Sequence, residues 1–206
     1  MAIPVSELQK ITPSSKLELF ELELVEGLHY ATGNPSSVPT IYRFHSGCNM
    51  NSNAEIIWQT NTYQRFPIQF DGAEFSGKGQ IPRPQLSMSN LGGITRSGSV
   101  ITVTDLLILC NLVTPHNDLI NAKLTRLTVL ASDLDATNFP GNTNPFGTPS
   151  SNKFPDEIFF LDRKVLENRE VVQYELVSAL DLANVFVPKR QITRKDFDGV
   201  GTFIDA

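Results

Sequence analysis

The run from Lys16 to Val25, KLELFELELV, alternates charged and apolar side chains along the chain. Successive side chains of a β-strand point to opposite faces, so this alternation predicts a strand rather than a helix. The apolar side chains occupy odd positions up to Leu19 and even positions from Phe20 onward. We expect a β-bulge near Phe20, because one inserted residue reverses the face to which the following side chains point.

Other short segments with the composition of strands are separated by clusters of Gly, Pro, Asn and Ser. We expect strands at Thr40–His45, Glu55–Thr60, Ser87–Asn90, Lys123–Ala131, Glu157–Leu161 and Glu170–Ser178. The last two should form an antiparallel hairpin around residues 167–169. Val172, Tyr174 and Leu176 would then face the core. The strand from Lys123 is apolar on both faces, which indicates a sheet that is covered on both sides.

Two short helices complete the predicted elements. Ser6 can cap an N-terminal helix that runs to Ile11, before Pro13. Thr104 can cap an internal helix from Asp105 to about Leu112, whose apolar residues recur at helical spacing. The predicted fold is therefore mainly β (α+β), with antiparallel β-sandwich or barrel-like domains, one internal helix and a short N-terminal helix.

The 206-residue chain is long enough for two small domains. We expect an N-terminal β domain at 1–100, a second β domain with the internal helix at 101–190, and a C-terminal extension at 191–206. The second domain contains a Pro/Gly/Asn-rich segment at 138–152, which we interpret either as an exposed contact arm that orders on assembly or as a mobile surface loop.

Charge and hydropathy exclude two classes of partner. The net charge is −5, so the chain lacks the cationic surface needed to bind a phosphate backbone, and we expect no nucleic-acid recognition. It has neither a secretory leader nor an apolar run that could cross a bilayer, which predicts folding in the cytoplasm and no membrane insertion. Cys48 and Cys110 lack the spacing of a zinc site, so we expect two free thiols.

The segment from Gly72 to Gly79, GAEFSGKG, matches a phosphate-binding loop except at its last position. That loop needs a Ser or Thr after its Lys and a helix that starts there. Gly79 has no hydroxyl, and Pro82 and Pro84 disfavour a helix. We therefore expect a passage between strands and no nucleotide site. Its expected features are bends at Gly77 and Gly79, a solvent-facing Lys78, and core side chains at Phe75 and Leu86.

Residues that could act as acids, bases or metal ligands are scattered along the sequence. The histidines lack metal-ligand spacing, so we interpret them as surface or turn residues. Neighbouring carboxylates at loop edges are expected to be solvated, and an Asp-Phe-Asp-Gly segment lacks most ligands of a calcium loop. These candidates are His29, His45 and His116; Asp133 with Asp135 and Asp156 with Glu157; and Asp196 to Gly199. We expect no catalytic, cofactor-binding or metal-binding residues.

Two further features have structural interpretations. Trp58 is the only tryptophan, and its apolar neighbours favour a core position over an interface anchor. The segment Pro82-Arg83-Pro84 is too short for a polyproline ligand, and we expect it inside the fold.

Many short motifs occur in one order along the chain. They are Ile41–Gly47, Ile57–Gln59, Tyr63, Phe66–Ile68, Phe75–Gly79, Pro82–Pro84, Ser89–Asn90, Asn138–Gly141, Phe154–Glu157, Asp162–Lys164, Glu167–Asn168, Leu180–Leu182 and Pro188–Arg190. From about Glu7 to Arg190, this series resembles the phage minor tail protein L family.

The resemblance implies a structural protein of the virion tail tip rather than an enzyme. Its expected partners are copies of itself in a ring, with three copies expected, the distal tail protein and the central hub or tail-fibre protein. Members of the family continue into a cysteine-containing segment that is able to hold an iron–sulfur cluster, whereas this sequence has no cysteine after Cys110, so we expect no cofactor. The alternatives are a β-sandwich module that binds a glycan or receptor through Trp58 and tyrosines and, with less support, a hydrolase.

Overall fold

The computed structural model describes residues 3–33, 40–47, 55–74, 82–96, 99–179 and 181. Several expectations lie outside these residues. They are the thiol state of Cys48, the positions of Phe75 and residues 77–79, the Asp196–Gly199 turn and the 191–206 extension.

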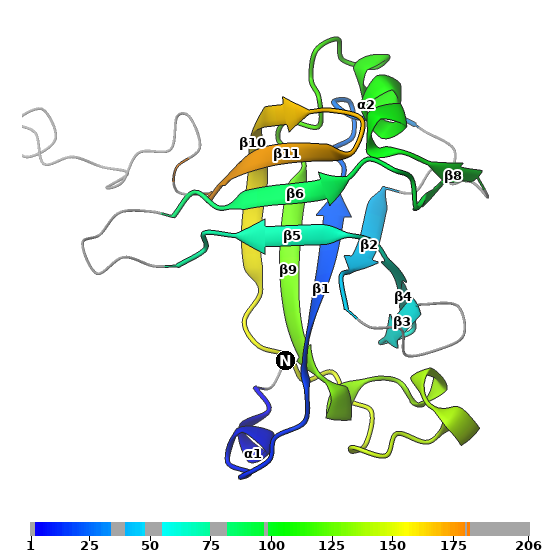
Figure 1. Cartoon of the computed structure of the whole chain (residues 1–206), viewed down its shortest axis with the longest axis vertical. Helices are drawn as coiled ribbons and strands as arrows, with labels where there is room; N and C mark the ends of the chain where they lie inside the picture. Colours follow the sequence, from blue (N-terminus) through cyan, green and yellow to red (C-terminus); the bar gives the residue numbers. More distant parts are fainter. Residues whose placement is uncertain are drawn as a thin grey trace, which may run out of the picture.

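The chain is mostly β, as predicted, and carries one helix longer than a single turn in its described part (Figure 1). The strands are β1 Lys16–Glu23, β2 Ile41–His45, β3 Glu55–Trp58, β4 Asn61–Arg65, β5 Ile68–Asp71, β6 Gln85–Ser89, β7 Ile94–Arg96, β8 Ser99–Ile101, β9 Lys123–Leu130, β10 Glu157–Glu167 and β11 Val171–Val177. The helices are α1 Val5–Leu8 and α2 Val103–Asn111, with 3-10 turns η1 Ala131–Asp133, η2 Ala136–Asn138 and η3 Pro140–Asn142.

Nine of the described strands form one mixed sheet in the order β3-β4-β2-β1-β9-β10-β11-β6-β5. Its pairs are antiparallel except β2 with β4. The sheet is open in the described part of the chain, because β3 and β5 are its edges. Both predicted ranges, 1–100 and 101–190, contribute strands to it, and β7 and β8 form a separate hairpin.

The sheet folds over on itself, so that β5, β6 and β11 cross in front of β1, β9 and β10 (Figure 1). Phe70 of β5 shows the contact between the two layers, because its ring lies 6.3 Å from that of Phe20 on β1 and 5.5 Å from that of Phe159 on β10. The main hydrophobic core fills the space between the layers. Each fully buried large side chain contributes about 1.5–3 kcal/mol of transfer free energy.

A second, smaller core lies on the opposite face of β1 and β9. It contains Leu19, Ile56, Trp58, Tyr63, Leu127, Val129 and Leu134. Trp58 is therefore a core residue, as predicted. The sheet is covered on both faces at β9, which confirms the interpretation of its doubly apolar sequence.

The expected bulge in β1 is wrong. The register of β1 with β2 and with β9 continues without a shift through Phe20. Leu19 packs into the second core, and Phe20 and Leu22 pack into the main core. The apolar side chains therefore change face because the strand separates two cores, and no residue is inserted.

The internal helix α2 closes one end of the main core with Val103, Leu106, Leu107 and Cys110. Its cap is Thr102 rather than the predicted Thr104. The Thr102 hydroxyl accepts from the Asp105 backbone N–H at 3.0 Å, and the Asp105 carboxylate accepts from the Thr102 N–H at 2.9 Å. This capping box holds the helix start from both sides.

The N-terminal helix is also shorter than predicted. It covers only Val5–Leu8, and its cap position is Pro4, so the prediction of Ser6 as the cap is wrong.

The β10–β11 hairpin is confirmed, although β10 continues further than predicted, to Glu167. Val172, Tyr174 and Leu176 are all buried in the main core. At the turn, the Asn168 carboxamide oxygen accepts from the backbone N–H groups of Glu170 and Val171, which fixes the reversal of the chain.

Candidate functional site

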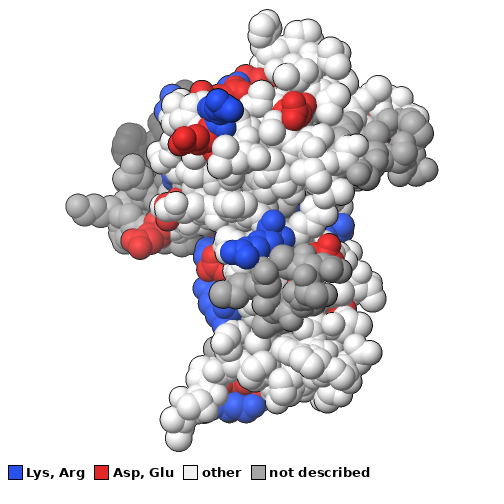
Figure 2. Space-filling model, turned by 45° about the vertical axis from the view of Figure 1, so that its right-hand side comes forward, with Lys and Arg blue, Asp and Glu red and all other residues white. Residues whose placement is uncertain are grey.

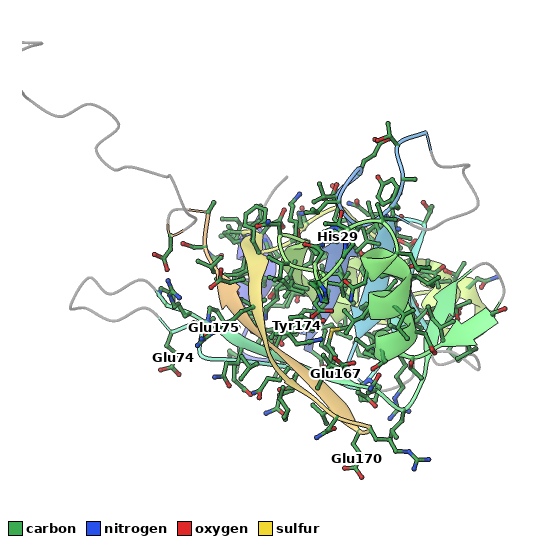
Figure 3. All side chains as sticks on the ribbon, turned by 90° about the horizontal axis from the view of Figure 1, so that it is seen from above. His29, Glu74, Glu167, Glu170, Tyr174 and Glu175 are labelled. Carbon is green, nitrogen blue, oxygen red and sulfur yellow. The ribbon has the colours of Figure 1, made fainter. Side chains whose placement is uncertain are left out.

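Of the histidines predicted to be surface or turn residues, His29 does lie in a turn, but both His29 and His45 are buried, so neither is a surface residue. The His29 Nδ1 accepts from the Val25 N–H at 2.8 Å, and its Nε2 lies 3.0 Å from the Ile120 carbonyl oxygen, to which it donates. Burial lowers the pKa of His29, so the neutral ring is favoured. Seen from above, His29 lies within the fold, whereas Glu74 and Glu170 lie at its periphery (Figure 3).

The other two histidines lie at the end of a strand and in a turn. His45 ends β2, and its backbone oxygen accepts from the Phe66 N–H at 2.9 Å. His116 is exposed in a turn with a φ of 62°, as predicted. In the described parts of the chain, no group of three or more His, Cys, Asp or Glu residues could hold a metal ion.

Asp133 and Asp135 are structural residues rather than solvated acids, which corrects the expectation for this pair. Asp133 is buried and accepts from the Ser150 hydroxyl at 2.6 Å. The Asp135 carboxylate accepts from the backbone N–H groups of Gln59 and Thr60 at 3.1 and 2.8 Å. Both carboxylates therefore connect the segment after β9 to other parts of the chain through hydrogen bonds.

The second acidic pair is bound to cations. Asp156 lies 2.6 Å from the Lys153 ammonium, and Glu157 lies 2.9 Å from Arg126. Arg126 also pairs with Glu18 at 2.6 Å and lies over the Phe70 ring at 5.0 Å. Its side chain is only 16% exposed. Arg126 was not predicted as a site residue, although a cation in the middle of the apolar strand KLTRLTVL indicates a buried ion pair.

Arg83 joins the start of β6 to the chain segment after β11. It lies 3.2 Å from Glu175 and 2.7 Å from Asp181, and Glu175 also pairs with Arg163. Pro84 is buried but Arg83 is exposed, so the prediction that the whole Pro-Arg-Pro segment lies inside the fold holds only for the proline that follows Arg83. Exposed pairs of this kind add little to stability, because water screens both charges.

The described part of GAEFSGKG leaves β5 through Gly72, which has a φ of +83°. A positive φ suits glycine, and no helix starts at this position. Leu86, which lies on the neighbouring strand β6, is fully buried as predicted.

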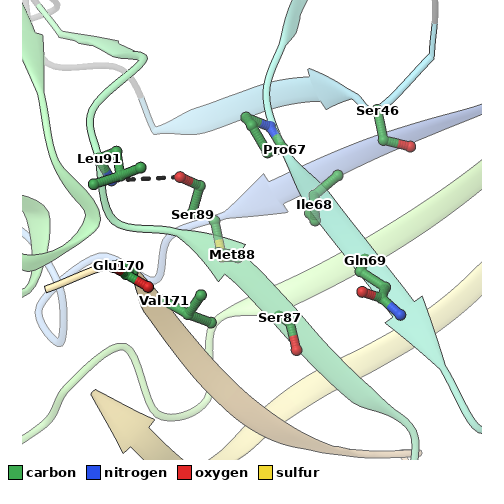
Figure 4. Close-up of a pocket in the computed structure, with 10 residues that line it drawn as sticks. All are labelled: Ser46, Pro67, Ile68, Gln69, Ser87, Met88, Ser89, Leu91, Glu170 and Val171. Carbon is green, nitrogen blue, oxygen red and sulfur yellow. Dashed lines mark hydrogen bonds between the residues drawn. The ribbon is translucent and has the colours of Figure 1, made fainter. Parts of the chain in front are cut away.

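An open groove of about 540 Å³ lies over β5, β6 and the start of β11 (Figure 4). Its floor includes Ile68 and Met88, and Leu91 lies at its rim with 73% of its surface exposed. Of the lining residues that the structure describes, only Glu170 is ionisable. A single carboxylate with no second ionisable group in the groove does not form an acid–base pair.

The segment between β9 and β10 forms a projecting lobe at the end of the molecule opposite α2 (Figure 1). From Ala136 to Asn152 its sequence contains no Lys, Arg, Asp or Glu. We call residues 136–152 the uncharged lobe. In Figure 2 the lower end of the molecule is mostly white, with one small group of blue and red side chains at its left.

Asn138 fixes the start of the uncharged lobe. Its side-chain oxygen accepts from the Ile57 N–H at 2.7 Å, and its amide nitrogen donates to the Ile57 oxygen at 2.6 Å and to the Asp135 oxygen at 2.8 Å. The side chain is only 2% exposed. This residue therefore attaches the lobe to edge strand β3.

Asn144 fixes the middle of the lobe in the same way. Its amide nitrogen donates to the backbone oxygens of Ala131, Ser132 and Leu134 at 2.9, 3.2 and 3.0 Å. Its side-chain oxygen accepts from the Phe146 N–H at 2.9 Å. The lobe is thus held by hydrogen bonds and contains two 3-10 turns, whereas the interpretations of residues 138–152 from the sequence were a contact arm that orders on assembly and a mobile surface loop.

Two aromatic rings give the lobe its apolar contact. Phe139 packs against the second core, and the Phe146 ring lies edge-on to it at 5.8 Å. Phe146 remains 53% exposed. Next to it, Gly147 packs tightly on Ser132, because a Cβ added at Gly147 would lie 2.9 Å from the Ser132 Cβ.

The composition of the uncharged lobe argues for a protein-binding surface rather than a catalytic site. Its polar groups are amides and hydroxyls, which suit hydrogen bonds to another protein and offer no acid–base chemistry. None of the helices in the described residues is long and apolar enough to cross a membrane. The arrangement is best suited to protein–protein contact, whose central residues are poor in charge and rich in aromatic side chains.

Comparisons with known proteins agree with a structural role. A family model described as phage minor tail protein L matches residues 36–198. The chain is also 34% identical over 104 residues to a protein named "Tail tip protein L" from Escherichia phage lambda. That alignment covers 50% of this chain and 38% of the lambda protein, so the chain spans well under half the length of this curated relative.

Proposed function

Because the chain belongs to the phage minor tail protein L family, a family of phage tail proteins, we propose that it is a structural subunit of the tail tip. In this proposal it joins the distal tail ring to the central hub of a virion or of a related phage-derived particle. It acts there as a ring of its own copies, with three expected, and as neither an enzyme nor a nucleic-acid-binding protein.

The observation that carries the proposal is the extent of the family match. Residues 36–198 include every strand of the large sheet except β1. The match therefore concerns the fold as a whole rather than one local motif. The position at the tip is supported by the name of the phage lambda relative, "Tail tip protein L".

The surface of the molecule supports an assembly role. Of the residues in an enzymatic interpretation, His29 and Asp135 bind backbone groups, Asp133 binds the Ser150 hydroxyl, and Asp156 and Glu157 bind cations. The uncharged lobe instead presents ordered polar groups and an aromatic ring. A subunit of a ring needs such complementary surfaces more than it needs a pocket.

Deletion of the gene tests the proposal. We expect the phage or phage-derived element that encodes the chain to produce particles without a functional tail tip, and complementation with the intact gene to restore infectious or complete particles. A complementing copy with an early stop codon is the matched control. Complete tails in the deletion strain would refute the proposal.

The glycan-binding alternative loses its main support in the structure. Trp58 is only 4% exposed and packs in the second core, so its ring is not available to stack on a sugar. Tyr42, Tyr63 and Tyr174 are also buried.

A further inference from the structure

We propose that the uncharged lobe is the surface through which one copy of this chain binds a second copy, with Phe146 as the anchor of the contact. The inference rests on the proposed function, because it names the contact surface of the proposed ring. It follows from the order, composition and charge of residues 136–152.

The lobe is ordered before any partner binds. Asn138 and Asn144 are both buried and together make seven hydrogen bonds to backbone groups. Six of these bonds go to β3 or to the chain just before the lobe, and the seventh goes to Phe146. Association costs free energy when side chains and loops must be immobilised, and a surface that is already rigid avoids much of that cost.

Phe146 has the properties of an interface anchor. It is 53% exposed, yet its ring is held edge-on against Phe139 at 5.8 Å. Exposed aromatic residues with a fixed position supply much of the binding free energy in interfaces, especially when polar groups surround them. The neighbouring Thr, Asn and Ser side chains supply such a rim.

Charge favours a second copy as the partner. The chain carries a net charge of −5, so two copies repel each other over most approaches. A contact made through the uncharged lobe brings no charged side chains of the lobe close to the second copy, so this repulsion is weaker there. A strongly charged partner would gain no ion pairs from this surface, because the lobe has no charged side chain.

The test is sedimentation of the purified full chain over a range of concentrations. We expect self-association of the wild type and at least a tenfold weaker association for Phe146→Asp, because each contact would then bury an unpaired charge. Leu112→Asp is the matched control. Leu112 is 76% exposed after α2, at the opposite end of the molecule, and this variant should associate like the wild type.

A second variant guards against a loss of fold. Thr148 is exposed in the lobe and outside the aromatic pair, so Thr148→Asp adds a charge without removing the contact between Phe139 and Phe146. We expect it to weaken association while leaving thermal unfolding unchanged. Association of both lobe variants at the wild-type strength, or a wild type that stays monomeric at every concentration, would overturn the inference.

Detection of the chain in purified particles separates this inference from the proposed function. Particles that contain wild-type chain and equal amounts of the Phe146→Asp variant would contradict the contact surface but not the tail role. Particles without the wild-type chain would contradict the tail role, whatever the sedimentation result.

Discussion

The side chain of Asn138 pairs with the backbone of Ile57 as a neighbouring strand would. It accepts from the Ile57 N–H at 2.7 Å and donates to the Ile57 oxygen at 2.6 Å. Because β3 is an edge of the described sheet, this side chain covers backbone groups that would otherwise lack a strand partner. One residue thus connects the sheet edge to the uncharged lobe.

Asn138→Asp should destabilise the protein strongly. A carboxylate cannot donate, and it would face the backbone oxygens of Ile57 and Asp135. We expect the free energy of unfolding in urea to fall by about 2–4 kcal/mol, since two hydrogen bonds are lost and two carbonyl groups lose their donor. Asn142→Asp adds the same charge at an exposed site of the lobe and should change stability by less than about 0.5 kcal/mol. Equal losses in the two variants would contradict this role of Asn138.

Asp135 should be required for the tight turn between β3 and β4. Gln59 and Thr60 have φ values of 49° and 63°, which cost energy in residues other than glycine, and the Asp135 carboxylate binds both of their N–H groups. Asp135→Ala should lower thermal stability by about 1–2 kcal/mol. The double change Gln59→Asn with Thr60→Gly supplies the residues that this turn prefers and should recover much of the loss. A lack of recovery would argue against strain in the turn.

Gly147→Ala should loosen the lobe. The new Cβ would lie 2.9 Å from the Ser132 Cβ and 3.0 Å from the Ser132 backbone oxygen, so the lobe must shift. Gly47→Ala is the control, because the nearest atom to its new Cβ would be at 3.8 Å, an ordinary contact distance. Hydrogen exchange should speed up in residues 131–152 for the first variant alone. Unchanged exchange in Gly147→Ala would contradict the packing of this glycine.

His29 should make stability depend on pH. Its folded-state pKa lies below the ordinary value of 6.5, because burial disfavours the charged ring. The unfolded chain therefore binds the proton first as pH falls, and the free energy of unfolding should decrease below about pH 6.5. His29→Gln should flatten this dependence. The same slope in wild type and His29→Gln would contradict the assignment.

The elements with strong local patterns were predictable from the sequence. Most of the predicted strands begin and end within a few residues of their expected positions, because alternation and turn residues act locally, whereas β4, β5, β7 and β8 were not predicted. The cap of α2 was misassigned between two nearby threonines. The pattern Thr102-x-x-Asp105 is a usable signal for the correct one, since an acid three residues after the cap completes a capping box.

The features that depend on distant parts of the chain were not predictable. His29 is buried because its ring binds the Ile120 carbonyl, which lies 91 positions away in sequence. The face change in β1 reflects two cores whose other walls come from β3, β6 and α2. Likewise, the order of the uncharged lobe comes from buried asparagines, and an Asn in a polar loop gives little indication of whether its side chain is exposed.

Immunogold labelling of purified particles tests the central claim most directly. An epitope-tagged chain that still complements the gene deletion should be detected by gold particles at the tip of the tail, opposite the head, and by mass spectrometry of the same preparation. Labelling confined to the head or along the tail tube, or particles that contain no trace of the chain, would contradict a structural role at the tail tip.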